Sequence, residues 1–347
     1  MAVLFGDGVN ADHDEGRLGE GAPQPQGFSP HLSKCTILHA EDEACLLPVR
    51  LKTIEYCVSC AERLVRLTPE REALLFRSLS DPAKAVIFYV IAFVMVFLIA
   101  ANPQIFRQGS GAVSMMTSIS SVLIMMLILT REGWSVEGWR RIGLLTAGLR
   151  GWWPAVLFPA AVLIGSAALL VATGLATFHG PAGEASALHM TGNLFFALLV
   201  SIGFAFCEEI GWRGYMLSKL LGLGAVTATL VVGLMQGLWH LPLMLMTSYY
   251  HASGNVLIVV PMFLLTLTLA GLFFGYLRLS TGSVWPPAIA HGVFNLIWGV
   301  GSELLTPDRA ETMEYIGGES GLLVILSLIV TAAILVPRLR SFQVPAN

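Results

Sequence analysis

Long runs of apolar residues, separated by short polar segments, make up most of the chain after about residue 84. About 20 residues in a helix cross the ~30 Å hydrocarbon core of a bilayer, and the runs are close to this length. The pattern therefore predicts an all-α polytopic membrane protein with about eight transmembrane helices and a short soluble N-terminal extension. The predicted spans are Ala85–Ala101, Ala112–Thr130, Trp153–Gly174, Met190–Leu221, Ala225–Thr247, Asn255–Arg278, Trp285–Val300 and Gly321–Pro337.

The fourth predicted span differs from the others because charged residues occupy its second half. The run is apolar as far as Phe206 and then reads CEEIGWRG, which contains Glu208, Glu209 and Arg213. One interpretation is a single long helix that carries these charges at membrane depth. The alternative is a shorter span that ends near Cys207 and leaves the charges at the membrane interface.

Composition supports the membrane assignment and removes one class of partner. Of the 347 residues, 55% are hydrophobic and 12% are charged, whereas an ordinary soluble domain has roughly 25% charged residues. The net charge of −3 gives no basic excess that would attract nucleic acid. We therefore expect the lipid bilayer, and no nucleic acid, as the general partner of the chain.

Three regions are expected along the chain. Residues 1–30 are rich in Gly, Asp, Glu and Pro and lack the apolar core of a signal peptide, so we predict a disordered tail. Residues 31–83 mix apolar and charged positions and are predicted to form a small cytosolic segment of unknown role. Residues 84–340 form the predicted transmembrane domain, and its polar motifs are concentrated in residues 190–300.

Four of the five cysteines lie in the 31–83 segment, with two histidines near them. These residues are Cys35, Cys45, Cys57, Cys60, His31 and His39. The Cys57-x-x-Cys60 pair resembles half of a zinc site, but the other two cysteines form no second tight pair. We therefore favour reduced thiols, which a cytosolic location also favours.

The distribution of Lys and Arg predicts the orientation in the membrane. The basic residues of alternate loops, beginning with the N-terminal flank, are Arg66, Arg71, Arg77, Lys84, Arg131, Arg140, Arg141, Arg150, Lys219, Arg278, Arg338 and Arg340. The opposite loops hold Arg107 and Arg309. Positively charged loops stay in the cytosol. We therefore expect a multi-pass protein of a prokaryotic plasma membrane with both termini in the cytosol.

The charged residues of the fourth span are expected to be functional. A charge at the bilayer centre costs at least ~2.5–3.5 kcal/mol, so such residues usually face a protein interior and perform chemistry or transport. In a helix, Glu209 and Arg213 share a face and can form an ion pair. Glu208 points about 100° away from Glu209. We therefore predict that Glu208 is a free carboxylate.

Two further spans carry pairs of polar residues at helical spacing. Gln236 and His240 are four residues apart in the fifth span, and His291 and Asn295 have the same spacing in the seventh. Glu208 with His240 would supply a general base for water, and His291 with Asn295 would supply donors for a developing oxyanion. Taken singly, each residue could instead be a hydrogen-bonding link between helices. Their combination favours amide hydrolysis.

Three motifs thus lie on separate apolar spans. They are Glu-Glu-x-x-x-Arg at 208–213, His-Leu-Pro at 240–242 and His-x-x-x-Asn at 291–295. In type and order they resemble the motifs of the CAAX prenyl endopeptidase and bacteriocin-processing family of intramembrane proteases, and the resemblance covers roughly residues 190–300. It implies an eight-helix membrane fold with the site in a cavity among the fourth, fifth and seventh helices, so that residues 84–340 would be a transmembrane protease domain.

The resemblance also assigns roles to single residues. The positions that match the family's functional residues are Glu208, Glu209, Arg213, His240, His291 and Asn295. Glu208 corresponds to the catalytic Glu. One position departs from the family, because Gln236 stands four residues before His240, where Phe is common. A polar side chain there can change the cavity or its bound water.

The family is discussed both as metalloproteases and as metal-free, glutamate-dependent proteases. Glu208, His240 and His291 could ligate zinc, since two His and one carboxylate form a known catalytic set. However, the HExxH spacing is absent, and Asn295 suits an oxyanion hole. We therefore favour a site without metal or other cofactor, with zinc at these three residues as the alternative.

The predicted function is an intramembrane endopeptidase that hydrolyses a peptide bond of a membrane-anchored peptide or protein. The main alternative is a proton-coupled transporter in which the same polar residues form a relay, and a structural or adaptor membrane protein is the third. A carboxamide in register with a His favours the protease, and no internal repeat of the kind common in transporters is visible. Prenylated C-termini, bacteriocin precursors and other membrane-anchored peptides stay open as substrates.

Overall fold

The computed structural model describes residues 76–102, 104, 110–179, 187–247 and 253–342. The predicted tail at residues 1–30 and most of the predicted cytosolic segment lie outside these ranges. The outlying residues include Cys35, Cys45, Cys57, Cys60, His31 and His39. The proposals for these residues therefore stay predictions.

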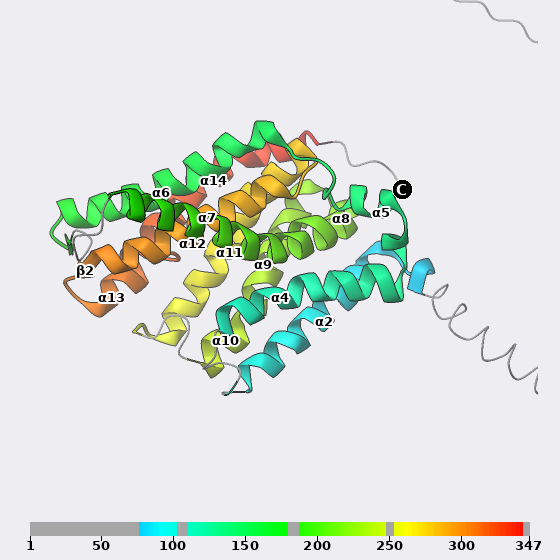
Figure 1. Cartoon of the computed structure of the whole chain (residues 1–347), viewed down its shortest axis with the longest axis horizontal. Helices are drawn as coiled ribbons and strands as arrows, with labels where there is room; N and C mark the ends of the chain where they lie inside the picture. The colour runs from blue at the N-terminus through cyan, green and yellow to red at the C-terminus, as the bar shows by residue number, and fades with distance from the viewer. Residues whose placement is uncertain (1–75, 103, 105–109, 180–186, 248–252, 343–347) are drawn as a thin grey trace, which may run out of the picture. The chain divides into compact units, whose positions relative to one another are not determined.

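Helices account for most of the described residues (Figure 1). In chain order they are α2 (Asp81–Ala100), α4 (Ser110–Leu123) with its π-helical continuation η1 (Ile124–Leu129), the 3₁₀ turn η2 (Glu132–Trp134), α5 (Val136–Arg141), η3 (Leu149–Gly151), α6 (Trp152–Ala172), α7 (Ala187–Glu209), the π-helix η4 (Ile210–Met216), α8 (Leu217–Leu220), η5 (Leu221–Leu223), α9 (Ala225–Trp239), α10 (Leu241–Met246), α11 (Val256–Thr281), α12 (Trp285–Leu304), α13 (Ala310–Thr312), the π-helix η6 (Met313–Gly317) and α14 (Leu322–Arg340). The apolar runs form helices because lipid cannot pair with backbone N–H and C=O groups, and a helix pairs them internally. The prediction of a mostly helical membrane protein is confirmed.

Six helical segments of the described chain are long and apolar enough to cross a membrane. They are Asp81–Ala100, Leu149–Ala172, Gly192–Leu223, Ala225–Met246, Val256–Thr281 and Ala310–Arg340. The second predicted span is the shorter apolar helix Val113–Leu129. The seventh is α12, a full-length helix whose polar residues, among them His291 and Asn295, lower its mean hydropathy. Each predicted run is therefore helical, while eight is only an approximate number of spans.

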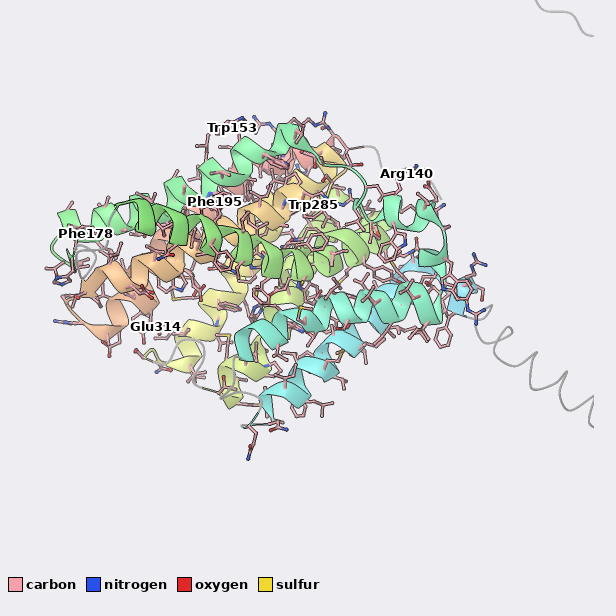
Figure 2. All side chains as sticks on the ribbon, in the orientation of Figure 1. Arg140, Trp153, Phe178, Phe195, Trp285 and Glu314 are labelled. Carbon is pink, nitrogen blue, oxygen red and sulfur yellow. The ribbon has the colours of Figure 1, made fainter. Side chains whose placement is uncertain are left out.

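A small antiparallel ribbon departs from the predicted all-α fold. It pairs β1 (Ala176–Phe178) with β2 (Leu305–Pro307), and Thr177 lies opposite Thr306. Strands of three residues are too short to show an alternating pattern, so the sequence does not reveal them. The ribbon follows α6 and α12 in the chain and joins the ends of these two helices, where Figure 2 shows Phe178.

A partly buried charge cluster joins three elements where α2 begins and α8 ends. Glu132 of η2 accepts hydrogen bonds from Lys84 at 2.8 Å and from Lys219 at 2.9 Å, and Asp81 lies 3.3 Å from the Lys219 amine. Burial alone would raise the pKa of Glu132, but the two lysines outweigh it and hold this pKa below its usual range. The cluster brings together lysines from two of the loops that were predicted to share one side of the membrane and Glu132 from a third.

Glycines allow the helices around the centre of the bundle to approach closely. α12 packs against α7 and α6, and α11 packs against α9 and α14. A Cβ atom on Gly292 would lie 2.7 Å from Cα of Ile202 in α7, and one on Gly271 would lie 2.5 Å from the carbonyl oxygen of Thr229 in α9. Small residues at such crossings are typical of membrane helices. They set the spacing of the helices that carry the three motifs.

Candidate active site

The first motif lies inside a continuous helix and not at a helix end. α7 passes directly into the π-helix η4 after Glu209, and the helical segment continues to Leu223. Every residue of η4 is buried. The helix therefore continues through the motif, as the longer interpretation of the fourth span predicts, while the depth of the motif in the membrane stays a prediction. Single π-helical turns inside α-helices occur frequently at functional sites.

Glu209 and Arg213 form the predicted ion pair. Nη1 of Arg213 donates to Oε1 of Glu209 at 3.0 Å, and the two side chains are 1% and 0% exposed. Nδ1 of His291 lies 2.9 Å from the same Glu209 oxygen. The guanidinium also stacks over the ring of Phe274, 4.8 Å from its centroid. Glu209 thus holds a cation from its own helix and a histidine from α12.

Glu208 has a different environment from its neighbour. Its Oε2 accepts a hydrogen bond from Nε2 of Gln236 at 3.0 Å, and its backbone oxygen accepts one from Ser118 of α4 at 3.2 Å. The oxygen of the Gln236 amide accepts a hydrogen bond from Nη1 of Arg213. Glu208 forms no ion pair with any residue that the structure describes. The two adjacent carboxylates are thereby separated into a paired one and one held by a neutral amide.

His240 stands at the break between α9 and α10. Pro242 follows it at the start of α10. Its Nδ1 lies 2.8 Å from the backbone oxygen of Gln236, and because a carbonyl only accepts, Nδ1 carries the hydrogen. In the neutral ring the accepting nitrogen is then Nε2. The rings of Trp239 and Phe263 meet the imidazole edge-on, at centroid distances of 4.6 and 5.2 Å.

The third motif lies on α12, which begins with Trp285 and has prolines in its first turn. Proline is favoured in this position because its missing N–H would be unpaired there in any case. His291 and Asn295 follow on one face, one turn apart. The hydroxyl of Ser201 in α7 donates to the Gly292 oxygen at 2.8 Å, which holds this turn of α12 against the helix of the first motif.

These groups meet at a cavity of about 470 Å³. Its polar lining includes Glu208, Gln236, His240, His291 and Asn295. Aromatic rings form much of its wall, among them Phe158, Phe263, Phe273, Phe274, Phe294 and Trp298. Four of the six predicted site residues therefore share one cavity, while Glu209 and Arg213 lie behind its lining and contact it through His291 and Gln236.

Two further carboxylates on the cavity wall were not expected from the sequence. Glu314 of η6 and Glu319 belong to the segment between β2 and α14, outside all predicted spans. Neither residue lies at helical spacing from a residue of the three motifs. The sequence therefore gives no local sign that this segment folds back onto the cavity. Figure 2 shows Glu314 on this segment, well separated from Arg140.

The fit of a metal can be judged from the arrangement of its candidate ligands. Among the described residues, no group of three His, Cys, Asp or Glu side chains is placed to hold a metal ion. Nδ1 of His240 faces a carbonyl, Nδ1 of His291 faces Glu209, and one oxygen of Glu208 faces an amide. These contacts leave the other ring nitrogens and the second Glu208 oxygen unassigned, so the absence of a three-ligand group among the described residues is a matter of how the side chains are placed. We derive no step through a metal.

Comparison with known proteins places the site within a family. A search of curated proteins found no match to the chain. A family model described as Rce1-like, type II CAAX prenyl endopeptidase Rce1-like, matches residues 190–297. The matched segment runs from α7 to α12 and contains every residue of the three motifs. The resemblance drawn from the motifs is confirmed, because residues 190–297 match the model of Rce1-like type II CAAX prenyl endopeptidases.

Proposed function

We propose that the protein is an intramembrane endopeptidase that hydrolyses a peptide bond of a membrane-anchored peptide or protein. The observation that carries the proposal is that Glu208, His240, His291 and Asn295, from three helices, line one largely apolar cavity. A carboxylate, two imidazoles and a carboxamide around one space supply a base and separate hydrogen-bond donors, which amide hydrolysis requires.

In the proposed mechanism, Glu208 and His240 hold a water molecule against the scissile carbonyl group. Glu208 takes one proton from the water while the water oxygen forms a bond to the carbonyl carbon. The carbonyl electron pair moves to its oxygen. Asn295 donates a hydrogen bond to this oxyanion, and so does Nε2 of His291 in its doubly protonated form, whose Nδ1–H donates to Glu209. When the oxyanion collapses, the C–N bond breaks and the proton on Glu208 passes to the leaving amine. Glu209 and Arg213 hold His291 and Gln236 in place and do not touch the substrate.

The decisive experiment removes the base and keeps its shape. In Glu208→Gln, cleavage is expected to fall by about 100- to 10,000-fold, because general-base catalysis contributes about this much. Protein termini in membranes from cells that express the wild type or the variant would be compared by mass spectrometry. The name of the matched family makes a farnesylated CAAX peptide in liposomes the first defined probe.

Glu303→Gln is the matched control, because Glu303 is an exposed carboxylate near the end of α12. Cleavage by Glu208→Gln at a rate close to that of the wild type would contradict the assignment of the base. Solute flux through wild-type liposomes without any cleavage would support a transporter.

We further propose that the site works without a metal. Two observations support this: the candidate ligands do not form a three-ligand set, and Asn295 lines the cavity with the histidines. Chelators are expected to leave cleavage intact, and active protein should contain far less than one zinc per chain. The measurement needs a Cys57→Ser/Cys60→Ser control, since these cysteines could carry an unrelated zinc. Zinc that survives this replacement, with activity lost to a chelator and restored by zinc, would overturn the proposal.

The orientation belongs to the same proposal. With both termini in the cytosol of a prokaryotic plasma membrane, the charge cluster of Lys84, Glu132 and Lys219 lies at the cytosolic side, as the distribution of basic residues favours. The β1–β2 ribbon follows the C-terminal ends of α6 and α12. In this orientation it lies at the side of the membrane opposite the cytosol.

A further inference from the structure

Gln236 is the residue through which the parts of the site are connected. Its side chain is 1% exposed, and its amide contacts both Arg213 and Glu208. Its backbone oxygen contacts Nδ1 of His240. The resemblance gives this residue no role, because a Phe is common at the position.

The chemistry of its two partners determines how the amide is turned. A guanidinium carries donors only, so the Gln236 oxygen faces Arg213. An ionised carboxylate only accepts, so the amide nitrogen faces Oε2 of Glu208, at 3.0 Å. The reversed amide would oppose donor to donor and acceptor to acceptor in a buried place. Buried donors and acceptors that are left unpaired destabilise the fold, so one orientation is strongly preferred.

This contact determines what Glu208 presents to the cavity. With Oε2 held, the carboxylate cannot turn freely about its last torsion. No described residue hydrogen-bonds to Oε1, and Glu208 lines the cavity. The donor is also neutral. Arg213 forms its ion pair with Glu209, so Glu208 is oriented without a direct ion pair.

We propose that Gln236 is a positioning residue for the reaction: its amide holds Glu208 with Oε1 toward the cavity, and its backbone oxygen holds His240 in the tautomer that accepts at Nε2. The inference rests on the proposed endopeptidase function and adds a residue to that site. A Phe at this position could fill the space but could neither donate to Glu208 nor accept from Arg213.

The test replaces the amide and keeps the backbone contact to His240. Gln236→Met has a similar length without donor or acceptor, and Gln236→Leu is a second variant in case the first folds poorly. In liposomes with the farnesylated CAAX peptide, or with a membrane-anchored peptide found by the comparison of termini, kcat is expected to fall by up to about 100-fold, because misplacing a reacting group by about 1 Å costs about this much. KM should change by less than about two-fold, because the variant keeps the contacts that bind the substrate equally well in the ground state and in the transition state.

The control loses a buried hydrogen bond elsewhere. Ser166 of α6 donates to the Gly317 oxygen at 3.2 Å and does not line the cavity. Ser166→Ala should therefore lower the thermal midpoint in detergent with kcat within about two-fold of the wild type. A loss of kcat in both variants that followed the thermal midpoint would show that Gln236 acts only through stability, which overturns the inference.

A second readout requires no substrate. The infrared carboxylate band of Glu208, identified by its absence in Glu208→Gln, is expected to shift in Gln236→Met, because its hydrogen bond is lost. An unchanged band, or a kcat within about two-fold of the wild type, overturns the role of Gln236 while the proposed function stands. Absence of cleavage by the wild type would instead defeat the proposed function, whatever Gln236 does.

Discussion

At the scale of single residues, two neighbouring glutamates show how position decides chemistry. Glu209 is fully buried and shares one oxygen between Arg213 and His291, whereas Glu208 meets a neutral amide and the cavity. The same side chain therefore has an ionic partner at one position and, in the proposed mechanism, takes a proton at the next. Arg213 bridges the two environments, since it contacts both Glu209 and Gln236.

Glu209→Gln should destabilise the protein. The change leaves the buried guanidinium of Arg213 without its carboxylate, and breaking one partner of a buried pair typically costs roughly 3–5 kcal/mol. His291 also loses its charged partner, so activity should fall together with the thermal midpoint measured in detergent. Glu209→Gln combined with Arg213→Met, which removes both charges, is expected to recover part of the stability. An unchanged midpoint in the single variant would contradict the structural importance of the pair.

At the scale of elements, close helix crossings place the motifs relative to one another. Gly292 follows His291 directly and brings α12 against the backbone of α7 at Ile202, while Ser201 bonds to the same turn. The depth and rotation of the third motif therefore depend on a position that carries no catalytic group.

Gly292→Ala is expected to separate α12 from α7. Its Cβ would lie 2.7 Å from Cα of Ile202, and overpacking of this kind typically costs about 1–3 kcal/mol. Cleavage should also decrease, since His291 moves with the helix. Gly301→Ala on the same helix is the control, because nothing lies within 4 Å of a Cβ built there. Equal thermal midpoints and activities for the two variants would show that the crossing tolerates a methyl group.

At the scale of the whole transmembrane part, polar groups gather at two places where helices end. One cluster pairs Lys84 and Lys219 with Glu132 and Asp81, and the low pKa of Glu132 keeps it charged at neutral pH. The other group is the β1–β2 ribbon with the segment that carries Glu314. Basic residues predominate near the first of these.

Accessibility to a thiol reagent that cannot cross membranes tests the proposed orientation. In a chain whose own cysteines are replaced, Arg140→Cys should react only from the cytosolic side, and Glu311→Cys only from the other side. Both native side chains are exposed, so failure to react would not come from burial. Labelling of both positions from the same side would contradict the topology, and a reversed pattern would contradict the orientation.

Much of the local organisation of this protein could be predicted from the sequence because it depends on contacts within one helix. The rise and rotation of an α-helix place Glu209 against Arg213, turn Glu208 away and put His291 in line with Asn295, whatever surrounds them. The apolar runs likewise determine where helices form, because lipid permits few alternatives.

Contacts between helices were decided only by the tertiary structure. The bond from His291 to Glu209, the bridge of Gln236 between Arg213 and Glu208, and the return of Glu314 to the cavity each join segments far apart in the chain. They depend on the rotation and spacing of packed helices, which close approaches such as the one at Gly292 determine. The spacing of residues along one helix contains no information about how that helix is rotated against its neighbours. The sequence alone therefore determined the groups available for catalysis, and packing decided which of them meet.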